Sequence, residues 1–166
     1  MRHILFTVSC VASLATWHAN AASSNPTVTL STGVKGRSAK TTFVGRSLPS
    51  FDQEVFLGIK YADQPTRFTP SSLKTVYSTN DRNAGPWASA SSATVLYNAT
   101  EYGYDCPAYG SDTTKLLQRG LMKMGEDCLN LNIIRPRTET GNKKLLPVMV
   151  WIFGGGWQQG ATADPR

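Results

Sequence analysis

The sequence predicts an α/β fold of which only a part is present, and three observations lead to this prediction. Residues 129–133 alternate leucine or isoleucine with asparagine, a period of two that is typical of a half-buried strand. Residues 145–153 form an apolar run, as in a strand covered on both faces at the centre of a sheet. A central strand needs neighbouring strands and crossover helices, and no helical segment of useful length is visible in the sequence. We therefore expect the missing partners to lie downstream of Arg166.

Two short antiparallel strands are predicted in the first part of the chain. The first contains Val28 and Leu30 and extends to Val34. The second covers residues 54–59, which are rich in β-branched and aromatic side chains. Turn-forming residues between positions 46 and 52 are expected to join these two strands.

A long loop is predicted between Tyr61 and about Met124. Proline and glycine interrupt every candidate helix or strand in this region, at Pro65, Pro70, Gly85, Pro86, Gly103, Pro107 and Gly110. A structureless run of this length counts against an assignment unless the loop is functional or is held in place. A disulfide between Cys106 and Cys128 would hold it in place.

The N-terminus has the features of a secretory signal peptide. A short basic start precedes an uncharged apolar run over residues 4–17, and residues 19–21 have the Ala-x-Ala form that a signal peptidase cleaves. We expect cleavage after Ala21, secretion to the extracellular space, and a mature domain over residues 22–166. The alternative is a membrane anchor, but a spanning helix needs roughly 20 unbroken apolar residues and this run is shorter. No stable membrane span is therefore expected.

Cysteine usage agrees with an oxidising compartment. Cleavage removes Cys10 and leaves Cys106 and Cys128, an even pair that is expected to form a disulfide in a secreted protein. Closing a loop of this size stabilises the folded state by about 3 kcal/mol through the entropy of the unfolded chain. The alternative is two unpaired buried thiols.

Residues 98–100 form an Asn-Ala-Thr acceptor for N-linked glycosylation. In a secreted chain this motif predicts a glycan on Asn98 and a position on a surface loop. The alternative is an unmodified chance match, because three residues carry little specificity.

The distribution of charge and the scarcity of metal-binding side chains argue against two classes of partner, nucleic acids and metal ions. The formal net charge is +6, but lysine and arginine are scattered along the chain, and Lys143 and Lys144 are their only adjacent pair. Nucleic-acid binding typically requires clustered basic residues interleaved with aromatic ones, so no nucleic-acid partner is expected. Clustered histidine and cysteine ligands are also missing from the sequence, so we expect no metal site and no cofactor.

Three consecutive glycines, Gly154, Gly155 and Gly156, follow the apolar run directly. Without a Cβ, the backbone there can approach a bound oxygen closely and turn its amides toward it. Such amides suit an oxyanion hole, in which preorganised donors stabilise the charge that develops on a carbonyl oxygen under attack. The alternative is a tight turn that only reverses the chain.

Three ordered motifs make the chain resemble one family, the type-B carboxylesterase/lipase group of the α/β-hydrolase fold. Residues 55–62, VFLGIKYA, with Thr-Arg-Phe at 66–68, resemble an early segment of that family. Residues 126–132, EDCLNLN, and residues 147–157, PVMVWIFGGGW, are similar to its E-D-C-L-x-L-N signature and its P-V-x-V-W-I-x-G-G-G-F block, and three ordered motifs are more specific than any one of them. The resemblance extends from about Val28 to the end of the chain and implies an N-terminal portion of an α/β-hydrolase domain.

The resemblance implies roles for particular residues. Gly155 and Gly156 would supply two oxyanion-hole amides, and a third would come from the residue after the nucleophile. Cys106 and Cys128 would form the first disulfide of the family.

An ion pair is also implied, between Arg67 and Glu126, with two solvated surface charges worth about 1 kcal/mol or less as the alternative. Asp127 is interpreted as a turn or hydrogen-bonding residue rather than a catalytic one.

The chain departs from the family pattern at several positions. Lys60 stands where proline is usual, and the segment after Ala62 is short. Phe153 precedes the glycines where histidine or tyrosine is common, and Trp157 follows them in place of phenylalanine. With its compact early segment, the chain most resembles fungal extracellular members.

A larger departure concerns the catalytic triad. No Gly-x-Ser-x-Gly motif occurs in the sequence, and His3 and His18 are its only histidines, both within the predicted signal peptide. The 166-residue chain is therefore expected to be inactive by itself.

Two functions from different classes follow from these motifs. The first is a carboxylic ester hydrolase with a serine acyl-enzyme mechanism, complete only in a longer protein and acting on a small-molecule or lipid ester. The second is a non-catalytic, cholinesterase-like secreted module for binding or adhesion. A small free-standing secreted protein is a weaker alternative, because it would leave the apolar strand over residues 148–153 exposed.

Overall fold

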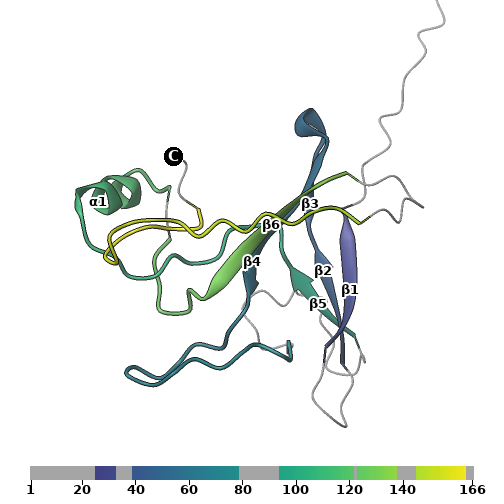
Figure 1. The fold of residues 1–166 in the computed structure, drawn as a ribbon, viewed down its shortest axis with the longest axis horizontal. Coiled ribbons are helices and arrows are strands. Elements are labelled where there is room, and N and C mark those ends of the chain that lie inside the picture. The colour runs from purple at the N-terminus through teal and green to yellow at the C-terminus, as the bar shows by residue number, and fades with distance from the viewer. Residues whose placement is uncertain (1–24, 33–38, 79–93, 122, 138–144, 164–166) are drawn as a thin grey trace, which may run out of the picture.

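The computed structural model describes residues 25–32, 39–78, 94–121, 123–137 and 145–163. Within these residues, two three-stranded sheets pack against each other and a short helix lies to one side (Figure 1). The predicted signal peptide with its cleavage site after Ala21, and Val34 of the first predicted strand, lie outside the described residues.

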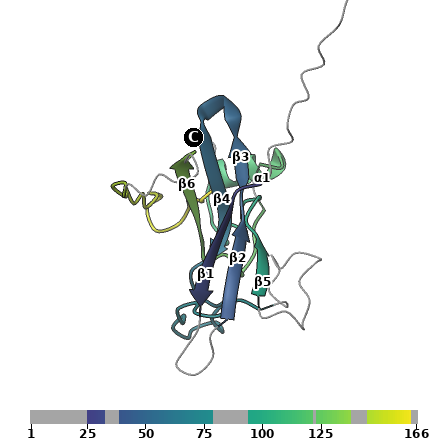
Figure 2. The ribbon, with the colours of Figure 1, turned by 90° about the vertical axis from the view of Figure 1, so that its right-hand side faces the viewer.

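The first sheet has the strand order β1-β2-β5. β1 (Thr27–Thr32) pairs antiparallel with β2 (Ala39–Val44), and β2 pairs parallel with β5 (Thr94–Asn98). Figure 2 shows these three strands side by side. Thr41 and Phe43 of β2 are both buried, because β2 is the central strand of this sheet and one of its faces meets the second sheet.

The second sheet has the order β3-β4-β6 and is antiparallel throughout. β3 (Arg46–Leu48) and the short 3-10 helix η1 (Pro49–Phe51) lead into β4 (Gln53–Lys60), and β4 pairs on its other edge with β6 (Asn130–Pro136). The strands predicted from residues 54–59 and 129–133 are therefore confirmed as β4 and β6. Each segment could be predicted as a strand from its own residues, because it contains β-branched side chains or an alternating pattern.

The predicted pairing of the first two strands was wrong. β1 pairs with β2 rather than with β4, and residues 46–52 contain β3 and η1 rather than a simple turn. β3 has only three residues, which is too short to show a periodic pattern in the sequence.

The region predicted as a loop between Tyr61 and Met124 is also more structured than expected. It contains β5 and the helix α1 (Ser111–Gln118). β5 is stabilised by a partner strand about fifty residues earlier in the chain, and α1 is too short for helical periodicity to be evident. No helix in the described part of the chain has the length and apolar character needed to cross a membrane.

Gly58 allows β4 to bend and connects the two sheets. The register between β4 and β6 shifts between Phe56 and Ile59, and Gly58 has a φ of 64°. A Cβ at this position would lie 2.7 Å from the amide nitrogen of Gly103, so only glycine fits without displacing that backbone. The Gly58 amide donates to Oδ1 of Asn132 on β6 at 2.9 Å.

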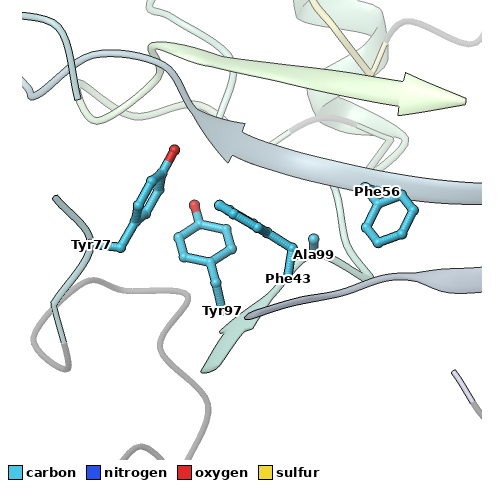
Figure 3. Packing of buried hydrophobic residues seen from close by; sticks show 5 residues of the cluster. All are labelled: Phe43, Phe56, Tyr77, Tyr97 and Ala99. Atoms are coloured by element: carbon cyan, nitrogen blue, oxygen red, sulfur yellow. The ribbon is translucent and has the colours of Figure 1, made fainter. Parts of the chain in front are cut away.

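Aromatic side chains fill the space between the sheets, in a cluster formed by Phe43, Phe56, Tyr77, Tyr97 and Ala99 (Figure 3). Phe43, Tyr77 and Tyr97 contact one another, with ring centroids 5.1 to 5.3 Å apart and two of the three pairs edge to face. Each such pair contributes about 0.5–1.5 kcal/mol beyond the burial of its surface. The hydroxyl of Tyr97 donates to the Gly58 carbonyl at 2.9 Å, and that of Tyr77 donates to the Lys60 carbonyl at 2.6 Å.

The segment predicted as a central strand, residues 145–153, belongs to neither sheet. No strand within the described residues pairs with it, and most of its large apolar side chains are exposed. Leu131 and Ile133 of β6, predicted to face the core, are also exposed, whereas Asn130 of the same strand is buried. An apolar pattern predicts burial, but burial also requires a surface to pack against, and the described residues do not present one to these side chains.

Ion pairs reinforce both ends of β4. Lys60 Nζ lies 2.6 Å from an Asp127 carboxylate oxygen, with both side chains largely buried. Arg135 pairs with Glu54 at 2.7 Å, and its guanidinium lies 5.1 Å from the centre of the Phe56 ring. The interpretation of Asp127 as a hydrogen-bonding residue agrees with its contact to Lys60.

The pair between Lys60 and Asp127 is expected to stabilise the fold more than a surface pair does. Asp127→Asn removes the negative charge from a site that is 18% exposed and leaves the Lys60 ammonium without it, which we expect to cost about 2 kcal/mol. Asp63→Asn is the matched control, since Asp63 pairs with Lys74 but is 53% exposed, and we expect less than about 1 kcal/mol. Urea unfolding of both variants measures the difference, and equal losses would contradict the expectation.

The hydroxyl of Tyr97 is expected to contribute to the free energy of unfolding in addition to the packing of its ring. Tyr97→Phe leaves the buried Gly58 carbonyl without this donor, and the free energy of unfolding should fall by about 1–3 kcal/mol. Tyr109→Phe removes the same atom from a side chain that is 81% exposed and should change it by less than about 0.5 kcal/mol. Urea midpoints at constant m-value provide the comparison, and a silent Tyr97→Phe variant would show that water replaces the lost donor.

Candidate functional site

A pocket of about 490 Å³ lies between the disulfide and a turn over residues 154–159, which we call the glycine turn. Gly154, Gly155 and Gly156 form one part of its wall, and Cys106 and Cys128 form another. Aromatic side chains contribute apolar surface, at Tyr61, Tyr104, Phe153 and Trp157. The structure therefore brings the predicted oxyanion-hole residues and the predicted disulfide to the same pocket.

The glycine turn has a conformation that requires glycine at Gly155. The carbonyl oxygen of Gly155 accepts hydrogen bonds from the amides of Gln158 and Gln159 at 3.2 and 3.1 Å, which closes the turn. A Cβ on Gly155, which has a φ of 150°, would overlap the carbonyl oxygen of Gln159. Trp157 completes the turn with a φ of 63°, a left-handed conformation that costs a non-glycine residue about 1–2 kcal/mol.

The amides of Gly155 and Gly156 donate to no protein acceptor among the hydrogen bonds of the described residues. Apart from Gly156 and its two chain neighbours, no heavy atom of the described residues lies within 4 Å of the position that a Cβ on Gly156 would take. Backbone donors without protein acceptors at the wall of a pocket have the chemistry needed to bind an oxygen that carries negative charge.

The structure joins Cys106 and Cys128 in a disulfide, as the sequence analysis expected. Two backbone hydrogen bonds lie next to the disulfide, since the Asp105 amide donates to the Lys123 carbonyl and the Gly125 amide donates to the Asp105 carbonyl. The two ends of the disulfide loop are thus held together by covalent and hydrogen bonds.

The disulfide loop also contacts the back of the glycine turn. The Tyr109 amide donates to the Gln158 carbonyl at 2.9 Å, and Leu116 of α1 packs against Ala161. Figure 1 shows the segment with the glycine turn, coloured yellow, folding back on the side of the molecule that carries α1. The position of the turn therefore depends on the loop that the disulfide closes.

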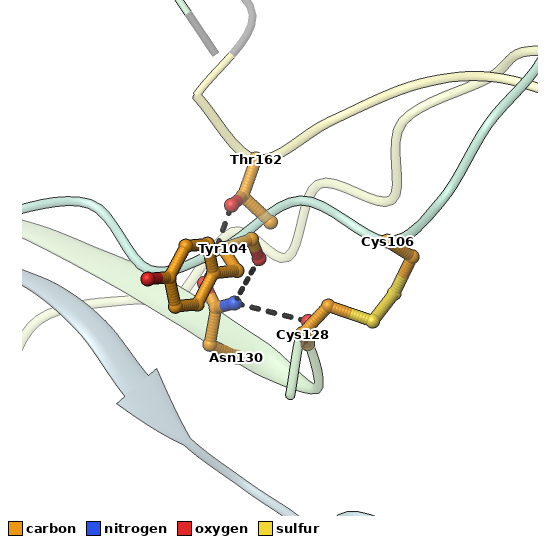
Figure 4. Close-up of a disulfide and its surroundings, with 5 residues drawn as sticks. All are labelled: Tyr104, Cys106, Cys128, Asn130 and Thr162. Carbon is orange, nitrogen blue, oxygen red and sulfur yellow. Dashed lines mark hydrogen bonds between the residues drawn. A yellow bond between two sulfur atoms is a disulfide. The ribbon is translucent and has the colours of Figure 1, made fainter. Parts of the chain in front are cut away.

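Asn130 connects these parts, and the sequence analysis missed its role. Its Nδ2 donates to the carbonyls of Tyr104 and Cys128 at 2.7 and 2.9 Å, and its Oδ1 accepts from Thr162 Oγ1 at 3.3 Å (Figure 4). Asn132, on the same face of β6, donates to the Thr162 carbonyl at 3.1 Å. Two asparagines spaced by two in a strand share a face, and this spacing was the available signal that their amides serve a common set of partners.

The other predicted residues lie away from the pocket. The Arg67 guanidinium is 6.0 Å from the centre of the exposed Phe68 ring, and its ion pair with Glu126 stays a prediction. Asn98 is the last residue of β5 rather than a loop residue, because it pairs with Val44. Its Oδ1 accepts hydrogen bonds from the amide and the hydroxyl of Thr100, and its glycosylation also stays a prediction.

Within the described residues, no group of three or more histidine, cysteine, aspartate or glutamate side chains is arranged to hold a metal ion. The sequence has no Gly-x-Ser-x-Gly motif, and His3 and His18 lie outside the described residues. The site therefore contains candidate donors for an oxyanion without the nucleophile and base that would generate one.

Alanine substitutions distinguish the two glycines of the turn. Gly155→Ala forces a Cβ into the Gln159 carbonyl, so it should displace the turn and reduce the free energy of unfolding by about 3 kcal/mol. Gly156→Ala meets no such obstacle and should cost only the left-handed strain of alanine at a φ of 61°, about 1 kcal/mol. Urea unfolding with near-UV circular dichroism measures both effects. A larger loss for Gly156→Ala would mean that the turn has another conformation in solution.

Comparison with known protein families supports the resemblance seen in the motifs. Residues 24–165 match the model of the carboxylesterase family. A secreted lipase of Arthroderma benhamiae is 46% identical over 69 residues, which cover 42% of this chain and 11% of that protein. Secreted lipase 1 of Botryotinia fuckeliana is 35% identical over 120 residues, which cover 66% of this chain and 19% of that protein. The chain thus spans less than a quarter of the length of these relatives.

Solved structures show the same relationship at the level of the fold. A thermophilic PNB esterase superimposes with a TM-score of 0.52 and 30% sequence identity, covering 72% of this chain and 21% of that structure. Para-nitrobenzyl esterase of Bacillus subtilis is 44% identical over 70 residues, which are 42% of this chain and 14% of that enzyme. The predicted fold class is confirmed, and the chain belongs to the carboxylesterase family, as part of an α/β-hydrolase fold.

Proposed function

We propose that this chain is part of a secreted carboxylic ester hydrolase in which Gly155 and Gly156 contribute the oxyanion hole. The observation that carries the proposal is the glycine turn, in which the amides of Gly155 and Gly156 have no protein acceptor among the described residues and which lines a pocket with an aromatic wall. Membership of the carboxylesterase family supports the same reaction class. The nucleophile, acid and histidine would come from residues beyond those of this chain.

In the proposed reaction, a serine oxygen attacks the ester carbonyl carbon while a histidine accepts the serine proton. The carbonyl oxygen becomes an oxyanion, and the amides of Gly155 and Gly156, with a third after the nucleophile, stabilise it. The alcohol leaves with the proton from the histidine, and water then hydrolyses the acyl-enzyme by the same route. Losing one such donor typically costs about 3 kcal/mol of transition-state stabilisation.

The pocket fits a small-molecule or lipid ester. Tyr61, Tyr104, Phe153 and Trp157 present apolar surface next to the polar glycine amides. This combination suits a substrate with an apolar acyl or alcohol group on either side of a polar carbonyl. The names of the similar proteins, lipases and a para-nitrobenzyl esterase, support an ester as the substrate class.

We also propose that the protein is secreted and carries a glycan on Asn98. The apolar leader with Ala-Asn-Ala at residues 19–21, the disulfide between Cys106 and Cys128, and the Asn-Ala-Thr acceptor support an extracellular protein. Two of the similar proteins are named as secreted lipases, which supports the same compartment.

The first experiment compares the 166-residue chain with the product of the complete reading frame, established by sequencing the transcript past the codon for Arg166. We expect the short chain to hydrolyse p-nitrophenyl acetate and butyrate at the background rate. The complete product should hydrolyse them, and Gly155→Ala should lower its kcat about 100-fold by displacing the oxyanion donors. Gly120→Ala is the matched control, because Gly120 also has a positive φ but does not line the pocket.

Two outcomes would contradict the hydrolase proposal. One is a reading frame that ends at Arg166 or continues without a serine elbow and a later histidine. The other is a complete product that binds esters without hydrolysing them. Either result favours the alternative of a non-catalytic secreted binding module.

A further inference from the structure

The side-chain amide of Asn130 makes three hydrogen bonds to residues that line the pocket. Asn130 is the first residue of β6 and is only 6% exposed. An asparagine amide has two N–H donors and one oxygen acceptor. Both donations come from Nδ2, to the carbonyls of Tyr104 and Cys128, while the oxygen accepts from Thr162 (Figure 4). We infer that Asn130 is a positioning residue that holds the glycine turn at a set distance from the disulfide.

The donor side of the amide holds the disulfide. Tyr104 lies two residues before Cys106, and Cys128 is the other half of the bridge, so Nδ2 connects the two strands of chain that the disulfide joins. The fit around the amide is tight, since a Cβ on Gly103 would lie 2.6 Å from the Asn130 side chain. Leucine or aspartate at position 130 would leave both carbonyls without the side-chain donor, while the Cys128 carbonyl would keep its hydrogen bond from the backbone amide of residue 130.

The acceptor side holds the segment that follows the glycine turn. Thr162 is bound twice by β6, through its hydroxyl to Asn130 and through its carbonyl to Asn132. Its neighbour Ala161 packs on Leu116 of the disulfide loop. The turn that Gln158 and Gln159 close on Gly155 is thus anchored just beyond its end.

This anchoring matters for catalysis if the proposed function is correct, and that part of the inference rests on the proposed function. Oxyanion donors act only when they lie close to the position that the charged oxygen takes, and a displacement of about 1 Å can cost about 100-fold in rate. Asn130 contacts neither substrate nor reacting atoms, so its effect would pass through the position of Gly155 and Gly156. The hydrogen bonds themselves do not depend on any activity.

Amide hydrogen exchange on the 166-residue chain tests the anchoring without an activity assay. Asn130→Ala should speed exchange at the amides of Gln158 and Gln159 in the turn and of Gly125 in the disulfide loop. The amide of Phe43 on β2 is the reference, and the increase at the other three amides should be about tenfold larger than at Phe43. Thr162→Val removes only the acceptor-side bond, so it should speed exchange at Gln158 and Gln159 but not at Gly125.

The control is Tyr77→Phe, which removes a hydrogen bond to Lys60 in the core and should act on Phe43 rather than on the turn. If Asn130→Ala accelerated exchange equally at all these amides, Asn130 would contribute only to the global stability of the fold, and the inference would be overturned. A Thr162→Val variant without effect on the turn would overturn it as well.

Steady-state kinetics of the protein encoded by the complete reading frame are the second test of the role of Asn130. Asn130→Ala should lower kcat about tenfold with KM changed less than about twofold, because misplaced oxyanion donors weaken the transition state more than the bound ester. A rise in KM alone would contradict a positioning role toward the glycine turn. If the complete product has no activity, the proposed function fails and the exchange pattern alone decides the inference on Asn130.

Discussion

The rest of the structure depends on the close contact at Gly58. The hydroxyl of Tyr97, from the first sheet, donates to the Gly58 carbonyl, and the Gly58 amide donates to Asn132 on β6. Because a Cβ at this position would meet the backbone of Gly103, the absence of a side chain allows β4, β5, β6 and the segment just before Cys106 to meet at one point. The aromatic cluster packs around this point, and the register shift in β4 follows from it.

From this point the connections run outward to the pocket. Gly58 positions β6, β6 presents Asn130 and Asn132, and these two amides hold the disulfide loop and Thr162. The glycine turn is thus supported by β6 and by the disulfide loop together, in addition to the two hydrogen bonds to the Gly155 carbonyl that close it. A polar network of this kind specifies one arrangement when its members are satisfied, because a lost partner would leave a buried amide or carbonyl unpaired.

The apolar segment over residues 145–153 shows the opposite situation. Its side chains have the pattern of a covered strand, yet most of them are exposed in the described structure, together with Ile133 and Ile134 of β6. Large exposed apolar patches usually mark a surface on which another molecule or another part of a protein packs. The similar carboxylesterases and lipases are several times longer than this chain, which agrees with that interpretation.

The sequence by itself determined the family, the strands β4 and β6, the disulfide between Cys106 and Cys128, and the glycine run, because each depends on a local pattern or an ordered motif. Only the tertiary structure decided that β1 pairs with β2, that β5 joins them from far along the chain, and that Asn130 is buried while Leu131 is exposed. The physical reason is that strand pairing and the satisfaction of buried polar groups are set by neighbours distant in the sequence. A period of two shows that two faces exist, and the surrounding chain determines which of them is covered.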